Sequence, residues 1–180
     1  SSNIFLMKPS LKWFVLSISI IIPVIISFFL HFFGKNNYEV PIFHEESVGN
    51  YSFCLSKVEF PFYVKSDSIF KIGENFVLID IRLDNENQKF INNELERLIN
   101  NNFILNVYSI TSFKLDNDRK TLMLNKPELI KYVSCKFLYD INFSSLILID
   151  KFGRIRGYYE SNSEEEFERL SAELKILMSI

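Results

Sequence analysis

Residues 146–159, LILIDKFGRIRGYY, carry the clearest structural signal in the chain. The first four residues predict a buried strand, and Asp150 to Gly153 have the composition of a tight turn. The remainder predicts a second strand, so the stretch should fold as a β-hairpin. Ser163 and Glu166 follow at the spacing of a capping box, which predicts a helix directly after the hairpin. Its apolar stripe would be Phe167, Leu170, Leu174, Leu177 and Met178.

Upstream of the hairpin, the hydrophobic pattern predicts a strand–helix–strand unit. Residues 76–83 are almost continuously apolar, as in a central strand covered on both faces. Apolar residues then recur at helical spacing from 90 to 99, after an Asn/Asp cluster at 84–87 that would cap the helix. Residues 103–110 predict a second strand, parallel to the first because a helix joins them. Pro127 marks the start of another helix.

This order of strand–helix–strand, helix, hairpin and helix is the connectivity of a thioredoxin-like α/β fold. We therefore expect a mixed central sheet flanked by helices. Residues 51–64 alternate in polarity and predict one more strand, which Pro61 would restrict to a sheet edge or a bulge.

The amino-terminal part has a different character. Residues 13–33 contain no Asp, Glu, Lys or Arg and predict one uncleaved transmembrane helix, since ~1.5 Å per residue gives roughly 30 Å. Lys8 and Lys12 precede this segment, whereas the first acidic residue is Glu39. The positive-inside rule then predicts a cytoplasmic tail and a periplasmic domain. The expected organisation is a tail at 1–12, a transmembrane helix at 13–33, an extended linker at 34–50 and a thioredoxin-like domain at 51–180.

The charge balance narrows the class of partner. All 22 acidic residues lie beyond residue 38, so the domain is mildly acidic, and it contains no basic stripe. Nucleic-acid binding needs a basic footprint, and we expect none here. We also see no glycine-rich phosphate loop, and we expect no small-molecule substrate.

The two cysteines, Cys54 and Cys135, are 81 positions apart. An oxidising compartment would permit a disulfide between them, but two cysteines do not make a disulfide framework. The favoured interpretation is two buried, inert thiols. A metal site built from Cys54, Cys135 and His44 is an alternative that the spacing does not support.

The hairpin stretch 146–159 and the acidic-capped helix after it resemble the end of the Sco/SenC proteins. This resemblance implies a membrane-anchored thioredoxin-fold factor that helps to assemble the copper centre of cytochrome c oxidase. The family binds copper through a Cys-x-x-x-Cys pair after the first central strand and a histidine before the hairpin. Soft thiolates and an imidazole suit Cu(I). The corresponding positions here are about Asp84, Gln88 and Asn142, so the resemblance carries no metal ligands, and we expect no cofactor.

Other candidate sites are weaker. Asp80, Asp84 and Glu86 suggest a hard-cation site, although solvated acids near a helix start are commoner. Arg154 and Arg156 suggest an anion site, but alternate positions on a hairpin strand predict a solvated face. A Ser/His/Asp site would need His31 or His44, which we expect to lie outside the folded core.

The sequence therefore predicts a non-enzymatic, membrane-anchored Sco-like protein of the cytoplasmic membrane. Its expected partners are the lipid bilayer and the subunits of a respiratory, cytochrome oxidase-type complex. The alternative is a copper chaperone or a thiol-redox protein that uses Cys54 and Cys135. A third possibility is an unrelated tethered thioredoxin-like module.

Overall fold

The computed structural model describes residues 9–33, 39–46, 54, 58–101, 103–115 and 119–179, with side chains in α1 described only for 13–29. These residues belong to two compact units, Ser1–Glu39 and Val40–Ile180. The predictions for residues 1–8, 34–38, 47–53, 55–57 and 116–118, and for the side chain of His31, lie outside the described part.

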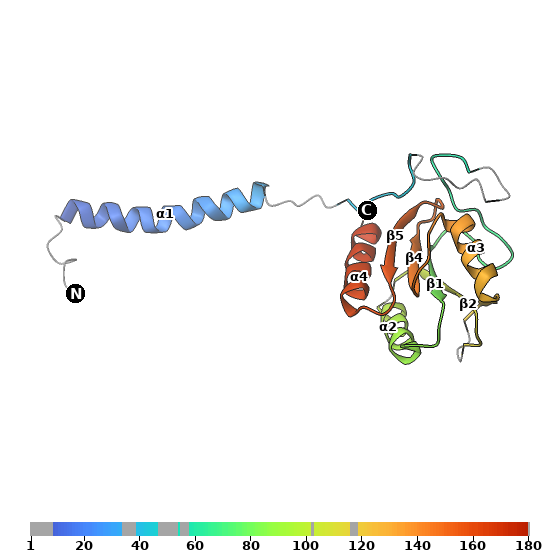
Figure 1. Ribbon diagram of the computed structural model, residues 1–180. Helices are drawn as coiled ribbons and strands as arrows, with labels where there is room; N and C mark the ends of the chain where they lie inside the picture. The colour runs from blue at the N-terminus through green and yellow to red at the C-terminus, as the bar shows by residue number, and fades with distance from the viewer. Residues whose placement is uncertain are drawn as a thin grey trace. The chain divides into compact units, whose positions relative to one another are not determined.

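The first unit contains one helix, α1 (Pro9–Phe33), which includes Pro23 (Figure 1). The predicted helix at 13–33 is present and begins four residues earlier. All of its described side chains, from Trp13 to Phe29, are exposed. Among the described residues, no helix combines the length and the hydropathy that a membrane crossing requires. The transmembrane assignment of residues 13–33 stays a prediction.

The second unit is built on a mixed sheet of five strands in the order β3-β2-β1-β4-β5. The strands are β1 (Phe76–Arg82), β2 (Leu105–Thr111), β3 (Thr121–Met123), β4 (Ser145–Ile149) and β5 (Ile155–Glu160). β1 is central and pairs in parallel with β2, with Leu78 opposite Val107, and antiparallel with β4. β4 and β5 form the expected antiparallel hairpin. The three-residue edge strand β3 was not predicted, because it follows a polar loop and is too short to show a period.

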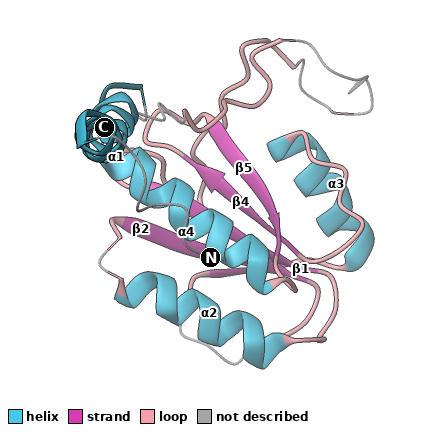
Figure 2. Cartoon of the chain, turned by 90° about the vertical axis from the view of Figure 1, so that its left-hand side faces the viewer, coloured by secondary structure: helices cyan, strands magenta, loops and turns pink. Residues whose placement is uncertain are grey.

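Three helices cover the sheet, with α2 (Gln88–Asn100) and α4 (Glu164–Ser179) on one face and α3 (Lys126–Phe137) on the other (Figures 1 and 2). The alternation of β1 explains both layers. Leu78 packs with Leu95 of α2 and Leu170 of α4, whereas Ile79 packs with Val133 of α3. β1 is therefore buried on both faces, as its continuous apolar run predicted.

The helix starts follow the predictions only in part. The Asn125 side chain accepts a hydrogen bond of 3.0 Å from the Glu128 amide and caps α3, and the Glu166 amide lies 3.4 Å from Ser163 Oγ at α4. The predicted side-chain cap of α2 is wrong. Asn87 occupies the cap position in the left-handed region, with φ 54°, and makes no side-chain cap bond in the described structure.

The segment before β1 packs on the hairpin. The Phe43 amide donates to the Ile155 carbonyl at 2.9 Å, and the Val64 amide donates to the Gly153 carbonyl at 2.8 Å. The predicted strand at 51–64 is wrong where it is described, since residues 58–64 form no strand and the Phe60–Pro61 peptide is cis. Within the predicted linker 34–50, Val40 is buried and begins the compact unit.

This strand order, with the parallel β1–α2–β2 unit and the antiparallel hairpin followed by α4, is a thioredoxin-like fold. The predicted mixed central sheet flanked by helices is confirmed.

Candidate functional site

The junction between β1 and α2 is the place at which the resemblance puts the cysteine pair. Asp84 lies just beyond the strand, is exposed and accepts a hydrogen bond of 3.1 Å from the Glu86 amide. Gln88 is the first residue of α2. The loop that contains Asn142 is adjacent, because the Leu83 amide donates to Ser144 Oγ at 3.1 Å. The three positions therefore lie close to the β1–α2 junction at one end of the sheet, Asp84 and Asn142 in adjacent loops and Gln88 at the start of α2.

A metal site at this junction is not supported by its side chains. Within the described residues, no group of three or more His, Cys, Asp or Glu side chains is arranged to hold a metal ion. The suggested hard-cation set is separated, because Asp80 is fully buried whereas Asp84 and Glu86 are exposed.

Asp80 belongs instead to a buried ion pair beneath the junction. Arg82 donates through Nε to both oxygens of Asp80, at 3.1 and 3.0 Å, and its Nη2 lies 2.8 Å from Oδ2. The side chains of Asp80 and Arg82 are 0% and 1% exposed. Ser109 Oγ of β2 donates to the same carboxylate at 3.2 Å.

The network extends to α2 and to the loop before β3. The Asn92 side-chain oxygen accepts from Arg82 at 2.8 Å and from Arg119 at 2.6 Å. Sequence reasoning missed this network. The sequence does contain a signal for it, because Asp80 and Arg82 are two positions apart in a predicted central strand. Side chains at alternate positions of a strand lie on the same face, here the face that α2 covers. Because the pair is shielded from solvent, its role is to hold β1, β2 and α2 together rather than to contact a ligand.

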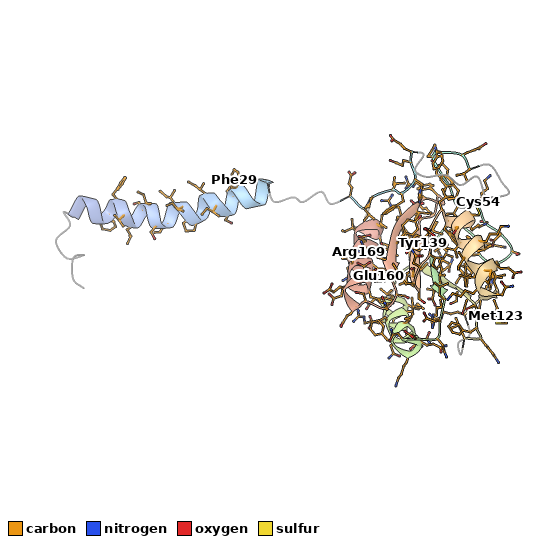
Figure 3. All side chains as sticks on the ribbon, viewed as in Figure 1. Phe29, Cys54, Met123, Tyr139, Glu160 and Arg169 are labelled. Atoms are coloured by element: carbon orange, nitrogen blue, oxygen red, sulfur yellow. A yellow bond between two sulfur atoms is a disulfide. The ribbon has the colours of Figure 1, made fainter. Side chains whose placement is uncertain are left out.

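The two cysteines form a disulfide, which corrects the interpretation of two buried thiols (Figure 3). The Cα atoms of Cys54 and Cys135 are 5.5 Å apart, and both residues are half-buried. Cys135 lies in the last turns of α3, so the bridge attaches the segment before β1 to that helix. A cavity of about 330 Å³ lies beside it, between residues from Val58 to Lys65 on one side and Cys135 and Lys136 on the other.

His44 packs against the domain, contrary to the prediction that it lies outside the core. Its Nε2 is 2.7 Å from the Tyr158 hydroxyl, and that hydroxyl donates to the Phe137 carbonyl at 2.8 Å. Since the hydroxyl has one proton, His44 Nε2 is the donor in the first bond. Burial lowers the pKa of His44, which favours the neutral imidazole with its proton on Nε2. The His44 imidazole therefore connects the segment before β1 to Tyr158 of β5.

Arg154 and Arg156 do not form the solvated face that the sequence predicted. Arg156 is 8% exposed, and Arg154 is half-buried. A bulge between β4 and β5 shifts the register at Leu148 and Ile149, and the segment before β1 covers Arg156. Arg156 Nη2 donates to the Val40 carbonyl at 2.6 Å.

No protein-family model and no curated protein sequence matches the chain. Similar solved structures include BsSco, a Sco family cytochrome c oxidase assembly protein, with 12% identity, a TM-score of 0.44 and coverage of 56% of this chain and 78% of that chain. A SCO1/SenC family lipoprotein from Bacillus anthracis matches with 13% identity, a TM-score of 0.44 and coverage of 58% and 82%.

A third similar structure is the thioredoxin domain of a thiol-disulfide oxidoreductase from Bacteroides vulgatus, with 16% identity, a TM-score of 0.39 and coverage of 54% and 78%. The similar structures thus include both Sco proteins and a redox enzyme. The fold assignment itself rests on the strand order. The chain has a thioredoxin-like fold, and Sco/SenC proteins, which its sequence resembles, are among the solved structures to which it is similar.

Proposed function

We propose that this chain is a membrane-anchored, non-catalytic Sco-like protein that acts as an accessory subunit or assembly factor of a cytochrome oxidase-type respiratory complex. The supporting observation is the β1–α2 junction. The resemblance predicts the family's cysteine pair at this junction, which lies next to the loop of Asn142, but the residues there are Asp84 and Gln88. Both cysteines of the chain are joined elsewhere. A domain with this arrangement is suited to binding a partner.

The anchor is the second part of the proposal. The described side chains of α1 are exposed and apolar, apart from three serines and Pro23. So much exposed apolar surface on one helix is unfavourable in water. A bilayer would cover this surface, and the positive-inside rule would put the domain in the periplasm.

The test is purification of the full-length protein from native membranes in a mild detergent, with identification of the proteins that accompany it. We expect the protein in the membrane fraction after carbonate extraction, together with oxidase subunits. A variant with a poly-leucine segment in place of residues 13–33 tests whether the anchor only tethers the domain or also contacts the complex. If it is only a tether, the complex should be unchanged. Recovery of the protein only as a free monomer would contradict the subunit role.

A thiol-redox function is the second candidate, and the observation that favours it is the disulfide beside a cavity. A thiolate of an external dithiol would attack one sulfur atom and release the other cysteine as a thiolate. The second thiol of the reductant would then resolve the mixed disulfide, leaving two cysteine thiols and an oxidised reductant. A copper site on Cys54 and Cys135 would first need this reduction, because thiolates are the ligands.

Alkylation of free thiols in cells, followed by a gel-shift assay, tests this second candidate. A redox function predicts a mixed population that shifts with the reducing state of the compartment. The double variant Cys54→Ser/Cys135→Ser provides the reference for a chain without the bridge. A bridge that stays fully oxidised under all conditions would exclude the redox function.

A further inference from the structure

A cavity lies at the opposite end of β1 from the positions at which the resemblance puts the metal ligands. Its volume is about 430 Å³. It is formed where the start of β1, the β4–β5 turn and the end of α4 meet. Its apolar lining consists of Phe76, Ile104, Phe152, Leu177 and Met178. Ile104 and Phe152 are each 61% exposed, so an apolar ligand would gain contact with side chains that are now in water.

The polar side of this cavity is mainly cationic. Lys151, Arg154 and Arg156 line it together with Asp150 and Glu74. The Arg154 guanidinium and the Lys151 ammonium lie 4.9 and 5.3 Å from the centre of the Phe152 ring. Positive charges therefore flank the most exposed aromatic side chain of the cavity.

The Asp150 carboxylate is the shared ion-pair partner of Arg154 and Arg156. Asp150 Oδ2 is 2.7 Å from Arg154 Nε, but 3.8 Å from Arg156 Nη1. Asp150 Oδ1 is already used, since it accepts from the Phe152 and Arg154 amides.

Arg156 is the least satisfied of these groups. It is 8% exposed, and its Nε has no hydrogen-bond partner among the described residues. Burial lowers the pKa of Arg156, and the Asp150 charge offsets this only in part. A buried guanidinium is costly unless nearby anions compensate its charge, and Asp150 Oδ2, 3.8 Å from Nη1, is the one carboxylate paired with it in the described structure.

We infer that this cavity binds an amphiphilic monoanion, with a carboxylate or phosphate head near Arg154 and Arg156 and an apolar tail against Ile104 and Phe152. The charged head matches the excess of cations, and the tail matches the apolar lining. This inference concerns the opposite end of the sheet from the metal-ligand positions and does not rest on the proposed respiratory role, and only its test uses the proposed membrane anchor.

The probe for the test is 4-phenylbutyrate, which is soluble and has both features of the inferred ligand. It is titrated calorimetrically into the full-length protein in phosphatidylcholine nanodiscs, with empty nanodiscs as the blank. We expect saturable binding, and no saturable binding of the neutral alcohol 4-phenylbutan-1-ol or of acetate in the same range. The alcohol lacks the anionic head and acetate lacks the apolar tail, so each compound loses one of the two sources of affinity.

Two pairs of exposed or half-exposed positions provide matched variants. Arg154→Gln and Ile104→Glu should each weaken binding at least about tenfold, because the first removes a cation and the second adds a repelling charge. Arg97→Gln and Ile99→Glu, on the exposed surface of α2, make the same changes outside the cavity and should bind normally. Near-UV circular dichroism checks that each variant is folded.

Binding that is equal in Arg154→Gln, Ile104→Glu and their controls would overturn the inference, as would equal binding of the neutral alcohol. Nanodiscs that contain phosphatidylglycerol distinguish the source of the anion. Weaker apparent probe binding in them indicates competition by a lipid headgroup, whereas unchanged binding indicates a soluble anion.

Discussion

Asp80 and Arg82 are charged residues in the central strand of the sheet, and both are buried. Two buried ions offset their desolvation only while both are present and hydrogen-bonded, and this pair has further partners in Ser109 and Asn92. Arg82 Nη1 is buried without a partner in the described structure, so even this network is incomplete. The network links β1 to β2 through Ser109 and to α2 through Asn92.

Removal of one member of the pair should therefore cost more than removal of both. We expect Asp80→Leu to lower the free energy of unfolding by about 3–5 kcal/mol, because it leaves Arg82 buried and uncompensated. The double variant Asp80→Leu/Arg82→Met should recover most of this loss. Urea unfolding followed by near-UV circular dichroism measures both.

Glu166→Gln is the control, since its pair with Arg169 is exposed and should contribute less than about 1 kcal/mol. A double variant as unstable as Asp80→Leu would show that the pair stabilises the fold beyond the avoidance of a lone charge.

Asp67 provides a pH-dependent test. Burial alone would raise the pKa of this carboxyl, but hydrogen bonds from Tyr132, from the Ile69 and Phe70 amides and from Lys136 lower it overall. The Tyr132 hydroxyl is 2.7 Å from Asp67 Oδ2. A carboxyl with a lowered folded-state pKa stabilises the protein above its unfolded pKa, and this contribution is lost as the pH falls through the folded value.

We expect Tyr132→Phe to be less stable than the wild type at pH 7, with a difference that shrinks as the pH falls from about 4, the ordinary pKa of an Asp carboxyl, toward the lowered pKa of folded Asp67. Urea unfolding from pH 3 to pH 7 measures the difference. A difference that stays constant over this range would show that Tyr132 acts through packing alone.

At the scale of elements, the β4–β5 turn connects the hairpin to the segment that precedes β1. Gly153 adopts φ +84°, and a Cβ atom there would lie 2.6 Å from the Val64 carbonyl oxygen. The backbone of Val64 is held close to this glycine, because the Val64 amide donates a hydrogen bond to the Gly153 carbonyl. Only glycine permits both the turn and this close approach.

Gly153→Ala should therefore lower the free energy of unfolding by more than about 1 kcal/mol. Gly73→Ala is the matched control, because a Cβ at Gly73 meets no atom within 4 Å, and its effect should be within about 1 kcal/mol of zero. Thermal unfolding of the two variants gives the comparison. Equal stability of both would mean that the turn relaxes around the new methyl group.

At the scale of the whole molecule, the disulfide determines how the chain before β1 is attached to the domain. Cys54 and Cys135 are 81 residues apart, so the bridge restricts the unfolded chain over a long loop. The segment before β1 also contacts the hairpin through its backbone, since the Phe43 amide donates to Ile155 and the Val64 amide donates to Gly153.

Reduction of the bridge should lower the free energy of unfolding by about 2–4 kcal/mol. The measurement is urea unfolding with and without dithiothreitol. The variant Cys54→Ser/Cys135→Ser should resemble the reduced protein and should not respond to the reductant. An unchanged midpoint on reduction would show that packing alone holds the segment in place.

The local patterns of the sequence were sufficient for most of the fold. The runs at 76–83 and 103–110, the helical spacing at 90–99 and the hairpin at 146–159 each have an apolar period that matches one type of element. Those signals are local, because the face that a residue presents depends on its neighbours a few positions away. The same reasoning failed for β3 and for residues 58–64, where short or irregular segments have no period to detect.

The sites were decided by tertiary structure. The sequence by itself determined that neither a thiol nor an imidazole stands at Asp84, Gln88 or Asn142, near which the resemblance to Sco/SenC proteins predicts the copper ligands. It did not determine that Cys54 meets Cys135, that Arg82 pairs with Asp80 beneath α2, or that Arg156 is buried under Val40. These contacts join residues whose side chains meet only after the layers have packed, and their energies depend on burial, which no local pattern records.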